Sequence, residues 1–283
     1  MHLGAVRYVL VAMLSAVPLC AQPKLAIERI ALHQFEDGPI LGLNHEFVPG
    51  ETIELSCRIT GYHIEKKDEK QYVKLTWQLR AVDASGVLVE KEASGGIDET
   101  VLPQDKNWIP KFLSTFIVPS FAPTGVYRIS VKVKDEFSGA EATAELPFNV
   151  KGHEVALSET LVARNVQFLR GENDQTPMRT VVYHPGETLW ARFDITGYKF
   201  GPNNLFEVSY GLAVLNSEGA QLFAVPEAAS EGNHSFYPQS YVPGVLSLHL
   251  DPNVPKGSYT LVIAVRDKTG SQNYESRQVF QVE

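Results

Sequence analysis

The residues able to do acid–base, metal or nucleophilic chemistry are few and lie far apart along the chain. Of its eight histidines, no two have the His-x-His or His-x-x-x-His spacing that brings two imidazoles to one zinc ion. The chain also lacks the Gly-x-Ser-x-Gly, His-Glu-x-x-His, phosphate-binding and paired-cysteine motifs. We therefore predict no catalytic residue, no metal site and no cofactor. The alternative is a hydrolase whose site is assembled from distant residues, which a single sequence does not reveal.

Cys57 is the one cysteine outside the N-terminal leader, because Cys20 lies within it. It alternates with apolar Leu55 and Ile59, and this spacing places it on the apolar face of a strand. A buried thiol without a basic partner is inert, so we expect a structural cysteine. With a single cysteine left, an intramolecular disulfide is excluded in the mature chain.

Aromatic side chains in two segments are the strongest candidates for recognition, because neither segment has a clear strand pattern and both are expected to be long loops. Rings beside amide and hydroxyl groups suit the flat faces of sugars or the surface of a protein partner. If they bind, we expect the rings to be exposed at the same end of two related modules. The alternative is that they pack beneath their own loops. These residues are Trp108 in 95–110, and Phe236, Tyr237 and Tyr241 in 226–244.

The strand and turn segments that must hold these aromatic loops in place occur twice in the chain. Three landmarks recur in the same order in both halves of the chain, which indicates a duplicated module. Each copy has about 130 residues, enough to bury its own core. We therefore divide the chain into a leader (1–21), a first module (22–151) and a second module (152–283), with a hinge at 151–154. The matched landmarks are Pro-Gly-Glu-Thr at 49–52 and 185–188, Ile-Thr-Gly-Tyr at 59–62 and 195–198, and Pro-x-Gly-x-Tyr at 123–127 and 255–259.

Within each copy, apolar and polar residues alternate with the period of two that is typical of half-buried strands. The runs at 74–81 and 207–214 both end at a turn that starts with Asp or Asn and ends with Gly. The Pro-x-Gly-x-Tyr segments predict a sandwich corner in which the tyrosine bonds to backbone. Pro147 lacks an N–H and is expected at a sheet edge or bulge. Because no amphipathic helix is evident outside the leader, we predict an all-β protein of two tandem antiparallel sandwiches.

Several of these segments resemble bacterial immunoglobulin-like and macroglobulin-like domains. The resemblance rests on Phe-Val-Pro-Gly-Glu at 47–51, Tyr-His-Pro-Gly-Glu at 183–187, the Asp/Asn-to-Gly turns and the Pro-x-Gly-x-Tyr segments. It implies an Ig-like sandwich fold for both modules. The Cys-Gly-Glu-Gln sequence of thioester-bearing macroglobulins is absent, so the resemblance implies no covalent trapping chemistry.

The N-terminus predicts export. Arg7, an apolar run at 8–17 and Pro-Leu-Cys-Ala at 18–21 form the pattern of a secretory signal peptide. The apolar run is shorter than the roughly 20 residues that span a bilayer. We expect cleavage after Ala21 and a secreted or periplasmic protein, whereas acylation of Cys20 is the alternative.

Charge limits the classes of partner. The formal charge is −8, and loss of Arg7 with the leader makes it −9 in the mature chain. An acidic chain with no second apolar run disfavours nucleic acid and membrane insertion. We predict an exported, non-catalytic binding or spacer protein whose partner is an envelope or extracellular protein. The alternative is a carbohydrate-recognition module that uses the aromatic loops.

Overall fold

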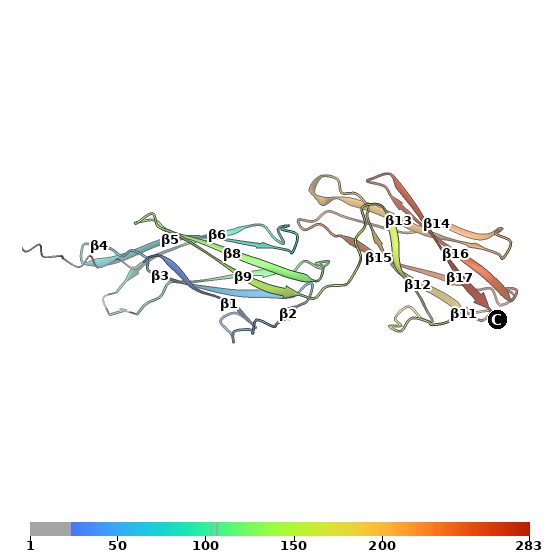
Figure 1. The fold of residues 1–283 in the computed structure, drawn as a ribbon, viewed down its shortest axis with the longest axis horizontal. Helices are drawn as coiled ribbons and strands as arrows, with labels where there is room; N and C mark the ends of the chain where they lie inside the picture. Colours follow the sequence, from blue (N-terminus) through green and yellow to red (C-terminus); the bar gives the residue numbers. More distant parts are fainter. Residues whose placement is uncertain (1–23, 103, 106) are drawn as a thin grey trace, which may run out of the picture.

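The structure is a computed structural model that describes residues 24–283 except 103 and 106. The expected signal peptide, its cleavage after Ala21 and the acylation alternative lie outside the described residues. The predicted all-β class is confirmed, because four sheets pair into two sandwich modules. The modules lie end to end, with β4 at one extreme and the C-terminus at the other (Figure 1). Among the described residues, none forms a helix long and apolar enough to cross a membrane.

Module 1 is a sandwich of a three-stranded and a six-stranded sheet. The first sheet has the order β1-β3-β7, and the second has the order β2-β9-β8-β5-β4 with β6 paired to β5. β2 pairs with β9 only near its end, so β9 is unpaired on that side at Pro147, as the missing N–H predicts. The strands are β1 (Ala26–His33), β2 (Glu46–Phe47), β3 (Thr52–Thr60), β4 (Glu65–Lys67), β5 (Lys70–Val82), β6 (Ala93–Val101), β7 (Lys111–Ile117), β8 (Gly125–Asp135) and β9 (Glu141–Val150).

Module 2 repeats this plan. Its three-stranded sheet has the order β10-β12-β15, matching β1-β3-β7, and its five-stranded sheet has the order β11-β17-β16-β13-β14. Its elements are β10 (Val162–Leu169), β11 (Val182–Tyr183), β12 (Thr188–Thr196), the 3-10 helix η1 (Pro202–Asn204), β13 (Phe206–Leu215), β14 (Gln221–Asn233), β15 (Tyr241–His249), β16 (Gly257–Asp267) and β17 (Gln272–Val282).

Parts of the two segments expected to be long loops are strands, which corrects the prediction for 95–110 and 226–244. β6 covers the first part of one segment, whereas β14 and the start of β15 occupy most of the other. Both β6 and β14 lie at sheet edges. β14 is exposed along nearly its whole length, whereas β6 alternates between half-buried and exposed residues up to Asp98 but carries glycine at 95 and 96. The alternation of apolar and polar residues that predicts a strand is therefore weak in both segments.

The duplicated turn and corner segments form as predicted. Tyr127 Oη donates to the carbonyl of Pro123 at 3.0 Å, and Tyr259 Oη donates to the carbonyl of Pro255 at 2.7 Å. In the turn of module 1, Asp83 Oδ1 accepts the N–H groups at positions 85 and 87 at 2.8 and 2.9 Å. These bonds fix the chain reversals at one end of each sandwich.

In one cross-strand pair of core residues, the large side chain lies on opposite strands in the two modules. Cys57 lies opposite Phe112 in module 1, and Phe193 lies opposite Gly244 at the same place in module 2. A Cβ added at Gly244 would lie 2.4 Å from the Phe193 ring, so a large residue fits on only one of the two strands. Cys57 is fully buried, which confirms its predicted place on the apolar face of a strand, and burial raises its pKa to about 12. That the thiol is inert stays a prediction.

Candidate functional site

Trp108 lies at the outer end of module 1 and is half-buried. Tyr62 packs edge-on against it, with ring centroids 6.0 Å apart, and donates from Oη to the Trp108 carbonyl at 2.8 Å. In module 2, Tyr198 takes the place of Tyr62 and donates to the carbonyl of Gln239. The two aromatic segments therefore occupy equivalent ends of their sandwiches, as expected.

The rings of the second segment lie in different environments. Phe236 is 47 % exposed, Tyr237 is only 8 % exposed and Tyr241 is half-buried. The expected exposure thus holds for Phe236 and not for Tyr237. Tyr237 packs against the core of module 1, not beneath its own loop, so neither of the sequence-based alternatives describes it.

Tyr237 joins the two modules. Its hydroxyl donates to Oδ2 of Asp83, 2.8 Å away, and Asp83 is itself buried in the turn at the end of module 1. Burial first, and then the hydrogen bond to Asp83, raise the pKa of Tyr237, so the hydroxyl keeps its proton and remains a donor. Tyr127 also lies beside this ring, and burial raises its pKa to about 12. A hydroxyl donor and a buried carboxylate thus meet in an apolar contact between modules.

A second set of contacts anchors the connecting segment. Tyr241 packs edge-on against Phe121 of module 1, with ring centroids 5.4 Å apart, and lies 5.1 Å from the His153 ring. His153 Nε2 lies 2.9 Å from Oδ2 of Asp194, which also accepts from Asn165 Nδ2 at 2.8 Å. The predicted hinge at 151–154 is therefore attached to the outer face of β12.

Sequence reasoning missed Asp83 as a partner of Tyr237, although a signal was present. The turn starts with Asp in module 1 and with Asn216 in module 2, while the rest of its geometry is shared. Phe-Tyr-Pro at 236–238 also has no counterpart in module 1. Unmatched residues in an otherwise matched pair of copies are where the two modules have different contacts.

Module 1 has a broad groove between the edge strands β6 and β7. The rings of Trp77 and Phe112 stack there, with centroids 4.2 Å apart and an angle of 3° between the planes. A Cβ added at Gly95 would lie 2.6 Å from the Trp77 ring, so only glycine lets this ring lie against β6. The groove has a volume of 990 Å³, and its lining also includes Trp108, Asp98, Glu99 and Asp105. Rings and carboxylates on an open edge form a surface suited to sugar hydroxyls and ring faces.

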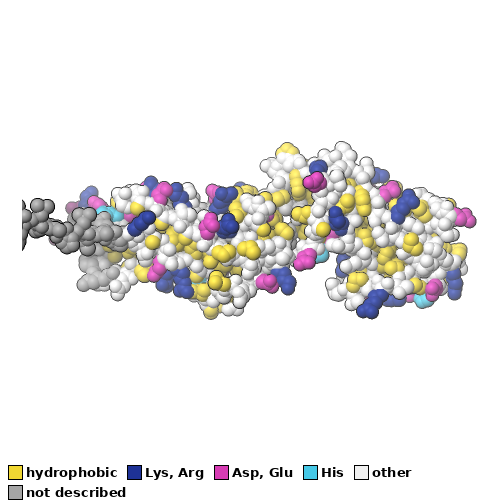
Figure 2. Space-filling view, in the orientation of Figure 1, with side chains coloured by type: hydrophobic (Ala, Val, Ile, Leu, Met, Phe, Trp, Pro, Cys, Tyr) yellow, Lys and Arg dark blue, Asp and Glu magenta, His cyan; other side chains and the backbone are white. Residues whose placement is uncertain are grey.

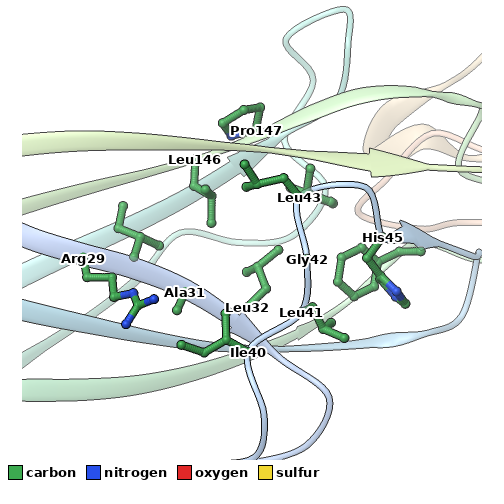
Figure 3. Close-up of a pocket in the computed structure, with 13 residues that line it drawn as sticks. Arg29, Ala31, Leu32, Ile40, Leu41, Gly42, Leu43, His45, Leu146 and Pro147 are labelled. Atoms are coloured by element: carbon green, nitrogen blue, oxygen red, sulfur yellow. The ribbon is translucent and has the colours of Figure 1, made fainter.

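A smaller pocket of 310 Å³ lies between β1 and β9, beneath residues 40–43 (Figure 3). Leu43 reaches toward Leu146 and Pro147, while Arg29 and His45 lie at opposite ends of the pocket. These two are the only polar side chains among the residues that line it, and neither is buried. We assign no ligand to this pocket.

No catalytic constellation stands out in the part of the chain that the structure describes. There, no group of three or more His, Cys, Asp or Glu side chains is placed to hold a metal ion. Acidic and basic side chains are interspersed over both modules on the face drawn in Figure 2.

No known protein family matches the chain, and no curated protein matches it. Among solved structures, the C-terminal domain of the AgI/II polypeptide BspA of Streptococcus agalactiae is 10 % identical over 91 % of this chain and 99 % of that domain, with a TM-score of 0.30. A family 123 glycoside hydrolase from Clostridium perfringens is 12 % identical over 44 % of this chain and 27 % of the hydrolase, with a TM-score of 0.29. Both TM-scores are below 0.5, so neither resemblance carries an argument about function.

Proposed function

We propose that the chain is an exported, non-catalytic protein of the cell envelope that holds two sandwich modules at a fixed separation and binds or spaces other molecules. The observation that carries this proposal is the contact of Tyr237 with Asp83. A flexible linker between independent domains would leave both side chains in water. Here the ring and the carboxylate are both buried and are hydrogen-bonded to each other across the joint, which gives the joint a defined geometry.

The fixed geometry can be tested by distance measurement between the modules. Thr143 and Arg277 are exposed strand residues of modules 1 and 2, and the native Cys57 is buried, so nitroxide labels attach to Thr143→Cys and Arg277→Cys selectively. We expect one narrow distance distribution from pulsed electron spin resonance. Tyr237→Ala should broaden it, whereas the control Phe236→Ala should not. A broad distribution in the otherwise unchanged chain would contradict the spacer role.

The second candidate function is carbohydrate recognition in the groove of module 1. The stacked ring of Trp77, the half-buried ring of Trp108 and the neighbouring carboxylates favour it. A glycan array identifies the sugar, and calorimetry then compares variants. Trp108→Ala should weaken binding by about 2 kcal/mol if this ring is a hot spot, whereas Phe236→Ala, outside the groove, should have no effect. Full binding by Trp108→Ala, or no glycan bound, would remove this candidate.

A further inference from the structure

The joint between the modules uses one end of module 1 as a receptor for an aromatic side chain. This end is formed by the Asp83 turn, the corner tyrosine Tyr127 and Ala122, which is fully buried. Tyr237 enters it from the loop before β15 and becomes part of the core of module 1. Module 1 therefore shows how an aromatic side chain covers this end of the sandwich fold.

Module 2 has the same end, and there no residue that the structure describes takes the place of Tyr237. A pocket of 270 Å³ opens beside Val214, Val254 and Tyr259. By strand register and by the Pro-x-Gly-x-Tyr match, these residues correspond to Ala81, Ala122 and Tyr127. An apolar cavity of roughly 150 Å³ is enough to bind benzene, so this pocket has room for an aromatic side chain.

The rim of this pocket is also apolar and exposed. Leu222 is 57 % exposed and Phe223 is 47 % exposed, and both line the pocket. In module 1 the matching segment contributes Val89, which is 5 % exposed. Large apolar side chains side by side at the end of a soluble domain are typical of an interaction surface.

The turn beside the pocket starts with Asn216, whose side chain has the shape of the Asp83 side chain in module 1 but carries an NH₂ group in place of one oxygen. Asn216 Oδ1 accepts the N–H groups at positions 218 and 220 at 3.0 and 2.8 Å, just as Asp83 Oδ1 does in module 1. The Nδ2 group of Asn216 therefore stands where Asp83 Oδ2 accepts from Tyr237. This end presents a neutral donor instead of a charged acceptor, so it prefers a ring flanked by an acceptor, such as a backbone carbonyl.

The outer end of module 1 in a second copy of this chain does not present a ring equivalent to Tyr237. The outer end of module 1 carries Asp105 and Trp108 where module 2 carries its Phe-Tyr-Pro segment, and Trp108 is packed against Tyr62. We propose that the C-terminal end of module 2 is a docking socket for an aromatic side chain on a loop of a β-sandwich domain in another protein. This proposal rests on the joint at Tyr237 and not on the role proposed for the whole chain.

The socket can be tested on the full mature chain with p-cresol as the probe, followed by methyl NMR. We expect saturable shifts of the Val214 and Val254 methyl groups and none at Ala122, whose socket is filled. Tyr237→Ala should empty that socket and make Ala122 respond too. Val254 is half-exposed and lines the pocket, so Val254→Phe should weaken p-cresol binding at least tenfold. Val279 is 59 % exposed and lies outside the pocket lining, so the control Val279→Phe should leave binding unchanged. If Val254→Phe fails to fold, Leu222→Glu at the exposed rim replaces it. If p-cresol causes no shifts, or if Val254→Phe and Leu222→Glu both leave the shifts unchanged, the proposed socket is wrong.

The class of partner is tested by a photoreactive benzoylphenylalanine at position 222 in the exporting cell. A crosslinked peptide from an aromatic loop of a β-sandwich domain supports the proposal. A crosslink to lipid, to glycan or to a helical protein, or no crosslink at all, overturns it.

Discussion

Truncating Tyr237 should destabilise module 1, although the residue belongs to module 2. Tyr237→Phe removes the hydroxyl that donates to Asp83 and leaves a buried carboxylate oxygen without that donor. Hydrogen bonds to charged groups contribute about 1.5–3 kcal/mol, and this is the expected loss for Tyr237→Phe. Tyr237→Ala also removes the buried ring. By analogy with aromatic truncations in protein cores, its total cost should be about 3–5 kcal/mol.

The three tryptophans let denaturation report on each module separately. Trp77 and Trp108 lie in module 1, and Trp190 lies in module 2, so Trp190→Phe leaves fluorescence that reports on module 1 alone. In that background, urea titration of Tyr237→Ala should lower the free energy of unfolding of module 1. The exposed neighbour Phe236 provides the control, since Phe236→Ala should change it by no more than about 0.5 kcal/mol. An unchanged transition of module 1 in Tyr237→Ala would refute the reasoning.

Three further results are expected within the modules. Cys57→Phe should destabilise module 1 by about 1–3 kcal/mol through overpacking. Adding Phe112→Gly recreates the pair seen in module 2 and should recover part of that loss in a denaturation double-mutant cycle. Additive costs of the two substitutions would show that the pair is not coupled. Burial raises the pKa of Asp135, but the N–H bonds from His63, Ser138 and Phe137 outweigh it and hold the pKa below its usual value. The unfolded carboxyl titrates near 3.9, so the stability that Asp135 contributes should be complete above about pH 4 and lost as pH falls through the folded pKa. The difference in unfolding free energy between the native chain and Asp135→Asn should therefore shrink below about pH 4. A difference that stays constant with pH would contradict this. With its pKa raised to about 12, Cys57 should react with Ellman's reagent only after unfolding, and fast labelling of the native protein would show an accessible thiol.

The features that the sequence predicted are those with a local pattern. Alternation places Leu75 and Leu79 on the buried face of β5, and the Pro-x-Gly-x-Tyr spacing is sufficient to form the bond from Tyr127 to Pro123. These features depend on neighbours within a strand or a turn, so one copy of the pattern carries the information. The duplication then gives the same result twice.

The features that the sequence missed depend on residues far apart. β14 is exposed along most of its length and β6 has glycine at half-buried position 95, so neither shows the clear apolar alternation that predicts a strand. The contact between Tyr237 and Asp83 spans 154 positions, and no local pattern around either residue identifies the other as its partner. The groove at Trp77 likewise depends on Gly95 from the next strand. Contacts between sheets and between modules leave only indirect traces, such as the exchange of Asp for Asn216 in the repeated turn.

The most direct test of the joint is ¹⁵N relaxation of the full mature chain in solution. If Tyr237 holds the modules together, backbone amides of β5 and β8 should report the same overall rotational correlation time as those of β13 and β16, as in one rigid body of this size. Tyr237→Ala should separate the two values and shorten both. Two different, shorter correlation times in the native chain would show that the modules tumble independently and would contradict the joint.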